Sequence, residues 1–113
     1  MMKKGGGSGM SGGMANLMRQ ANQLQMKIKK LQEELAECEY EGTSGGGAVI
    51  VRVKGESEVT ALKITEDVMK SGDVEMLQDL ILTATNDALK KARETSAAEM
   101  EKVTGGHGIP GLF

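Results

Sequence analysis

The sequence predicts an α+β domain with a long N-terminal helix, a three-stranded antiparallel sheet and a long C-terminal helix. Two observations support this prediction. Apolar residues recur at spacings of three and four in the first and last thirds of the chain, as on one face of a helix. Between these two stretches, β-branched residues alternate with polar ones and are interrupted by glycines, as in short strands joined by turns. A chain of 113 residues has room for one such domain.

The N-terminal helix is expected from about Met14 to Ala36. Its apolar stripe has the heptad spacing of a helix that packs against another helix, and it consists of Met14, Leu17, Ala21, Leu24, Ile28, Leu31, Leu35 and Cys38. Such a helix is too long for a small domain to cover, so we expect self-association. Residues 1–13 are mostly glycine and serine, a composition that predicts a flexible basic arm.

Three strands are expected to form an antiparallel meander. The middle strand should direct Val49, Val51 and Val53 to one face, and the third should direct Leu62 and Ile64 to one face. The expected strands span residues 40–44, 48–54 and 58–64, and one short helical turn should follow at residues 65–69.

The C-terminal helix is expected from Val74 to about Val103, with Asp73 as its N-cap. Its buried stripe should comprise Leu77, Leu80, Ile81, Ala84, Ala88 and Ala92. Beyond Ala92 the stripe fades, so the distal half is expected to project or to meet only a partner chain. Glycines should end the helix, which divides the chain into an arm (residues 1–13), a helix-sheet-helix domain (14–104) and a tail (105–113).

Charge is divided unevenly along the chain. The first 32 residues contain six basic and no acidic residues, whereas the remainder contains eight basic and all 16 acidic residues. The net charge of −2 therefore hides a basic N-terminal part and an acidic body.

The residues of enzyme chemistry are sparse. The chain has one cysteine and one histidine, so no cluster of metal ligands and no nucleophile with a neighbouring base is evident. We expect no catalytic residues, metal, cofactor or small-molecule substrate. Cys38, at a heptad position, should be a small buried hydrophobe. No apolar run is long enough to span a bilayer, so we expect a cytoplasmic protein without membrane association.

Binding to duplex DNA is the function that the charge pattern favours. Basic side chains gain affinity by neutralising phosphates and releasing counterions, and no aromatic residue is available in this part for stacking on unpaired bases. The expected contacts are Lys3, Lys4, Arg19, Lys27, Lys29 and Lys30, with Lys90, Lys91, Arg93 and Lys102 on the second helix. Base-reading side chains are not clustered, so weak sequence preference is expected.

Several segments together resemble the YbaB/EbfC family of bacterial nucleoid-associated proteins. They are N-L-M-R-Q-A at 16–21, L-Q-E-E-L at 31–35, E-G-T-S-G-G-G at 41–47, M-L-Q-D-L-I at 76–81, N-D-A at 86–88 and P-G-L-F at 110–113. The resemblance implies a tweezers-like homodimer with projecting helices that binds duplex DNA in the nucleoid.

Two alternatives remain open. Met10, Met14, Met18 and Met26 would suit a prefoldin-like holdase, because methionine adapts to varied apolar clients. The acidic body would suit an adaptor that docks another protein.

Overall fold

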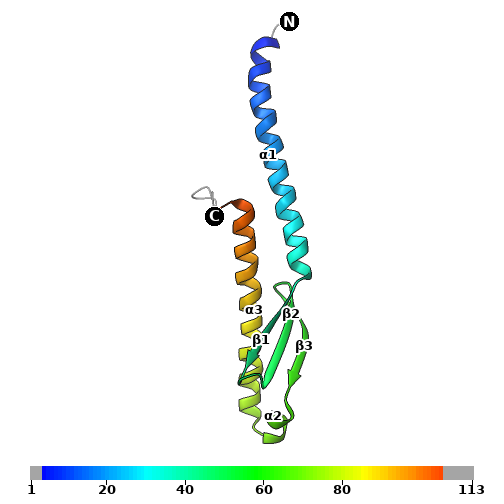
Figure 1. Ribbon diagram of the computed structural model, residues 1–113, viewed down its shortest axis with the longest axis vertical. Coiled ribbons are helices and arrows are strands. Elements are labelled where there is room, and N and C mark those ends of the chain that lie inside the picture. The colour runs from blue at the N-terminus through cyan, green and yellow to red at the C-terminus, as the bar shows by residue number, and fades with distance from the viewer. Residues whose placement is uncertain (1–3, 106–113) are drawn as a thin grey trace.

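A long helical arm projects from a small sheet-and-helix body (Figure 1). The computed structural model describes the backbone of residues 4–105 and the side chains of residues 12–105. The molecule measures 85 × 24 × 16 Å. The elements are α1 (Lys4–Glu37), β1 (Glu39–Ser44), β2 (Val49–Lys54), β3 (Glu58–Ile64), α2 (Glu66–Ser71) and α3 (Val74–Thr104). The predicted α+β class is therefore confirmed.

Helix α1 begins at Lys4, ten residues before its expected start. The structure thus differs from the expected flexible arm over residues 4–13, which are helical, whereas residues 1–3 lie outside the described part. Six of the ten residues from Lys4 to Gly13 are glycine, a poor helix former, so neither helix propensity nor an apolar stripe predicts this extension. A side chain at Gly12 or Gly13 would meet nothing within 4 Å. No periodic pattern in this segment could have indicated the earlier start.

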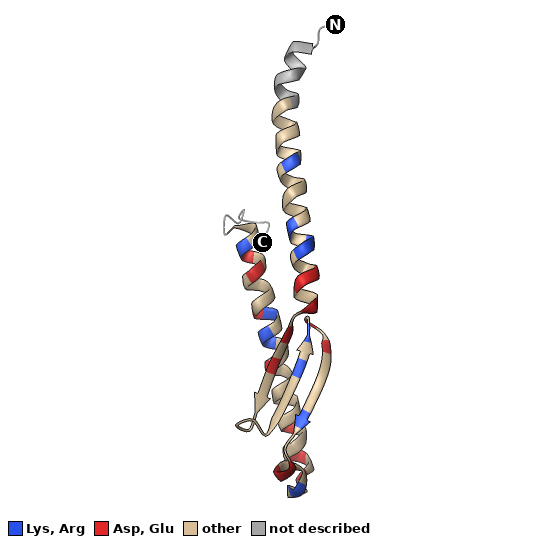
Figure 2. Cartoon of the chain, turned by 45° about the vertical axis from the view of Figure 1, so that its right-hand side comes forward, with Lys and Arg blue, Asp and Glu red and all other residues tan. Residues whose placement is uncertain are grey.

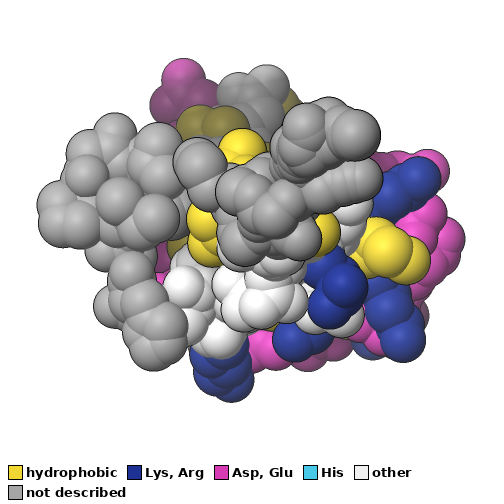
Figure 3. Space-filling model, turned by 90° about the horizontal axis from the view of Figure 1, so that it is seen from above, with side chains coloured by type: hydrophobic (Ala, Val, Ile, Leu, Met, Phe, Trp, Pro, Cys, Tyr) yellow, Lys and Arg dark blue, Asp and Glu magenta, His cyan; other side chains and the backbone are white. Residues whose placement is uncertain are grey.

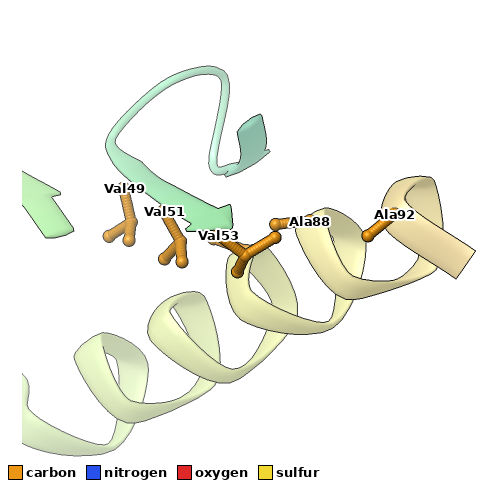
Figure 4. Packing of buried hydrophobic residues seen from close by; sticks show 6 residues of the cluster. Val49, Val51, Val53, Ala88 and Ala92 are labelled. Atoms are coloured by element: carbon orange, nitrogen blue, oxygen red, sulfur yellow. The ribbon is translucent and has the colours of Figure 1, made fainter. Parts of the chain in front are cut away.

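The core lies between the sheet and α3. The strands are antiparallel in the order β1-β2-β3, as predicted. Val49, Val51 and Val53 point from β2 toward the buried alanines of α3, and all six core residues are at most 1% exposed (Figure 4). Those alanines are Ala84, Ala88 and Ala92. Alanine on the helix lets the valine side chains fill the space between the two layers.

Strand β1 approaches α3 at backbone distance. A Cβ added to Gly42 would lie 2.9 Å from Ala88 Cα and closer still to the carbonyl oxygen of Ala84. Polar contacts fix the same crossing, because the Ser44 hydroxyl donates to the Leu80 carbonyl at 2.6 Å and Thr43 N–H donates to Asp87 Oδ2 at 3.1 Å. The outer edge of β1 is therefore held by the helix.

Local signals set both ends of α3. Asp73 Oδ1 accepts a hydrogen bond from Met76 N–H at 3.0 Å, which confirms the predicted N-cap. At the other end, Gly105 adopts the left-handed conformation (φ 79°), and its N–H donates to Glu101 O at 2.8 Å. Glycine tolerates this positive φ without steric cost.

The distal half of α3 differs from expectation. It lies beside the C-terminal half of α1, where Ile28, Leu31 and Leu35 are half-buried, rather than projecting alone (Figure 1). The three-stranded meander explains this arrangement. The chain enters the sheet at the end of α1 and, after three strands, leaves at the opposite end of the sheet. Helix α3 must then run back along the sheet toward α1.

Cys38 was expected to be buried but is exposed. Helix α1 ends one residue earlier, so Cys38 leaves the apolar stripe, and its thiol donates to Glu34 O at 3.4 Å. Among residues 4–105, no helix is both long and apolar enough to cross a membrane.

Candidate nucleic-acid interface

The basic residues of α1 lie on its outer surface, away from the body. Arg19, Lys27, Lys29 and Lys30 are all exposed. Arg19 Nη1 donates to Asn16 Oδ1 at 3.3 Å, and none of the four forms an ion pair with another described residue. Figure 2 shows these basic positions above the acidic base of the helix. Their charge is therefore available to an anionic partner.

The three lysines border one shallow hollow on α1. The hollow has a volume of about 500 Å³ and is lined by Met26, Lys27, Lys29, Lys30 and Glu33. Arg19 lies 11 residues upstream of Lys30, roughly 16 Å along the helix axis at 1.5 Å per residue. Seen from above, Lys and Arg side chains lie along the right-hand and lower sides of the molecule (Figure 3). The structure thus gathers four predicted contacts along one helix.

The structure describes little of the two predicted N-terminal lysines. Lys3 lies outside the described residues, and Lys4 is the first residue of α1. The side chains of both lysines lie outside the described part of the chain.

The basic residues of α3 fall into two groups. Lys90 and Arg93 are exposed. Lys91, however, donates from Nζ to the Glu41 carbonyl at 2.9 Å and lies 3.3 Å from Asp87 Oδ2. Lys102 Nζ lies 2.8 Å from Glu99 Oε2, and the hydrogen bond to that carboxylate raises the pKa of Lys102. Lys91 and Lys102 are thus already engaged within the chain.

Asp87 and Lys91 together tie α3 to the edge of β1. The backbone hydrogen bond from Thr43 is the main cause that lowers the pKa of Asp87, and Lys91 lowers it further. Lys91 is among the expected DNA contacts, and its contact with β1 was not predicted from the sequence. The i, i+4 spacing of Asp87 and Lys91 was the one available signal, since such pairs face each other on a helix.

An ion pair also marks the base of the arm. Lys54 Nζ at the end of β2 lies 2.7 Å from Glu37 Oε2 at the end of α1, and that hydrogen bond raises the pKa of Lys54. Gly55 N–H donates to Cys38 O at 2.9 Å across the same junction. These contacts join the basic arm to the acidic body.

The structure thus presents a long helix with an exposed basic surface, carried on an α+β body. The chain belongs to the YbaB/EbfC DNA-binding family, whose pattern matches residues 10–107. This membership confirms the resemblance seen in the sequence.

Named relatives extend this result over nearly the whole chain. A nucleoid-associated protein of Clostridium novyi is 51% identical, with 99% of this chain and 100% of that protein covered. One of Clostridium acetobutylicum is 52% identical, with 98% and 100% covered. The crystal structure of the uncharacterized protein HP0035 from Helicobacter pylori has the same fold, with a TM-score of 0.67 and 24% identity over 80% of this chain and 96% of that one.

Proposed function

We propose that this chain binds duplex DNA as a homodimer, with weak sequence preference, through the basic surface of α1. The observation that carries the proposal is the set of four exposed bases on the projecting helix, none of them paired with a described acidic residue. Each phosphate that a lysine or arginine neutralises releases a counterion, so such a surface gains affinity without reading bases.

Duplex DNA is favoured over single strands by the residues that α1 lacks. Binding of unpaired bases relies on aromatic side chains for stacking, and the sequence of α1 contains none. Bidentate arginine contacts to guanine are the commonest base-specific contacts in the major groove, and Arg19 is the only arginine of α1. Weak sequence preference follows, and a protein that coats DNA in this way would organise the nucleoid and influence gene expression.

Homodimer formation is supported by apolar side chains that the chain itself leaves uncovered. On α1, Leu17 is 62% and Leu24 is 39% exposed, although both continue the stripe that packs against α3 lower down. Among the described residues, the fully buried hydrophobic core consists of three valines and three alanines. A chain of this size gains stability when a partner covers such surfaces.

A salt series on a labelled random-sequence duplex tests the proposal. The double variant Lys27→Glu, Lys30→Glu should weaken binding and reduce the steepness of its salt dependence. Two lysines on each of two arms correspond to about four phosphates, so the log-log slope should fall by roughly 3 to 4 at about 0.9 per phosphate. Fluorescence anisotropy at several salt concentrations measures both quantities.

A matched control separates contact from net charge. Lys63→Glu, Lys70→Glu makes the same charge change on exposed lysines of the sheet and α2. Affinity should fall much less for this control than for the α1 variant. Equal losses would show that only net charge matters, and an unchanged α1 variant would refute α1 as the contact. Competition between duplexes of different sequence then tests the weak preference.

A holdase is a second candidate function because methionines line the arm. Met14, Met18 and Met26 are 58%, 62% and 70% exposed, and methionine adapts to varied apolar partners. Suppression of client aggregation by the wild-type protein, retained in the Lys27→Glu, Lys30→Glu variant, would support this function. No suppression at excess protein would exclude it.

A further inference from the structure

The upper part of α1 stands clear of the rest of the described chain. Every residue from Gly12 to Lys27 is exposed, and half-buried positions begin only at Ile28, beside the end of α3 (Figure 1). This bare stretch carries Arg19 and Lys27 and no acidic residue. An α-helix with its side chains is about 10–12 Å across, and the major groove of B-DNA is about 12 Å wide. The upper part of α1 therefore has the size and the charge to lie in a major groove.

One side of α1 carries a line of exposed hydrogen-bonding side chains. Residues that follow one another at alternating intervals of four and three lie on the same side of a helix. We call this line the polar stripe, and it consists of Asn16, Gln20, Gln23, Lys27 and Lys30. In the sequence these residues are separated from one another, and the helix brings them together. The upper part of the stripe carries amides, and the lower part carries lysines.

Gln20 and Gln23 are the amides of the polar stripe that are open to a new partner. Arg19 Nη1 donates to Asn16 Oδ1 at 3.3 Å, so the Asn16 amide is already engaged. No hydrogen bond joins either glutamine side chain to another described residue. A glutamine amide accepts through its oxygen and donates through its nitrogen. These two groups match the N6 amino group and the N7 acceptor of adenine in the major groove.

The lysines of the polar stripe lie closer to the body than the glutamines do. Lys27 and Lys30 follow Gln23 by four and seven residues, which corresponds to roughly 6 and 10 Å along the helix axis. A lysine ammonium on its flexible stem binds phosphate as a point charge and carries no sequence information. The stripe thus places side chains that can read bases in its upper part and side chains that bind phosphate next to them.

We propose that Gln20 and Gln23 read adenine edges in the major groove, while Lys27 and Lys30 bind the phosphates beside that groove. This inference rests on the DNA binding proposed above and adds the side chains that read bases. It also agrees with a weak sequence preference, because two amides on one helix reach few base pairs. At the lower end of the usual range, one such amide–adenine contact discriminates by about fivefold.

The test compares a short alternating dA·dT duplex with the same duplex in which 7-deazaadenine replaces adenine. The replacement removes the N7 acceptor from the major groove and leaves base pairing and phosphates in place. By fluorescence anisotropy, the wild-type protein should bind the unmodified duplex about fivefold more tightly. The variant Gln20→Ala, Gln23→Ala should bind both duplexes equally. Its salt dependence should match that of the wild type, because it loses no charge.

A matched control lies on the other side of the same helix. Asn22→Ala, Gln25→Ala removes two exposed amides that are also three residues apart, and this variant should keep the preference for the unmodified duplex. Lys27→Glu, Lys30→Glu should keep the preference too, while its salt dependence becomes less steep. Alanine is a better helix former than asparagine or glutamine, so α1 should persist in both alanine variants, which circular dichroism verifies.

The outcomes separate this inference from the proposed function. Equal binding of the two duplexes by the wild-type protein, or a preference that survives Gln20→Ala, Gln23→Ala, would overturn the inference, while DNA binding would stand. A duplex RNA of matching sequence offers a further test, because its major groove is too deep and narrow for side chains to read. RNA bound as tightly as DNA would overturn entry into the groove. Absence of binding to any duplex at low salt would refute the proposed function itself.

Discussion

Gly42 is the position where a single added methyl group should do most harm. The glycine lies on β1 where the strand crosses α3, and an alanine Cβ would lie 2.9 Å from Ala88 Cα and closer still to Ala88 N and Ala84 O. All three neighbours are backbone atoms of a helix, so none can rotate away. Gly42→Ala should therefore force α3 away from the sheet.

The size of the effect follows from the packing and the hydrogen bond that a displaced α3 would lose. Ordinary contact with Cβ begins at about 3.4 Å, so α3 must move by roughly 1 Å at this point. That movement loosens the packing of Val49, Val51 and Val53 on the alanines, and it lengthens the 2.6 Å hydrogen bond from Ser44 to Leu80. Overpacking of a core typically costs about 1–3 kcal/mol. A clash with backbone atoms places Gly42→Ala near the upper end, at about 3 kcal/mol.

Urea denaturation followed by circular dichroism, at fixed protein concentration, measures this loss. Fixed concentration matters because self-association contributes to apparent stability. Gly13→Ala is the matched control: it makes the same substitution in α1, where the new Cβ meets nothing within 4 Å. Alanine is the better helix former by about 1 kcal/mol, so this control should not lower stability. A Gly42→Ala protein within about 0.5 kcal/mol of wild type would refute the proposed backbone contact.

Two further predictions concern α3. Asp87 stabilises the fold by accepting a hydrogen bond from Thr43 N–H, which lowers the pKa of Asp87, and Lys91 lowers that pKa further. A carboxyl group whose pKa is lowered in the folded state contributes stability above its unfolded pKa of about 4. This contribution is lost as the pH falls through the folded pKa. Asp87→Ala should therefore unfold at lower urea than wild type at neutral pH, with a gap that narrows on acidification, and a constant gap at every pH would contradict this assignment. Asp73→Ala should lower the free energy of unfolding by about 1 kcal/mol because it removes the N-cap hydrogen bond to Met76. Asp73→Ser, which retains a capping hydroxyl, should keep most of the stability. Equal urea midpoints for the two variants would show that the cap contributes little.

Local patterns in the sequence determined most elements. Alternation of valines predicted the buried face of β2, and the alanine spacing predicted the buried stripe of α3. Asp73 marked the start of α3, and Gly105 marked its end. These features were predictable because hydrophobic periodicity, N-caps and left-handed glycines act within a few residues of the chain.

Positions in the candidate interface were predictable to different degrees. The heptad pattern placed Arg19, Lys27, Lys29 and Lys30 off the apolar stripe, and the structure shows them exposed. The engagement of Lys91 with Glu41 was not predictable, because the two residues are 50 positions apart in the chain. Only the crossing of β1 over α3 brings them together.

The sequence by itself determined the order of helices and strands, the division of charge and the family, since each is a property of residue type and near spacing. The tertiary structure alone decided which apolar residues are covered. Leu62 and Val51 are both apolar residues of β-strands, and Leu24 and Leu35 belong to one heptad stripe. Leu62 is nevertheless 48% and Leu24 39% exposed, because α3 is narrower than the sheet and ends before the top of α1. Burial depends on what lies opposite a side chain in space, and no local pattern records that.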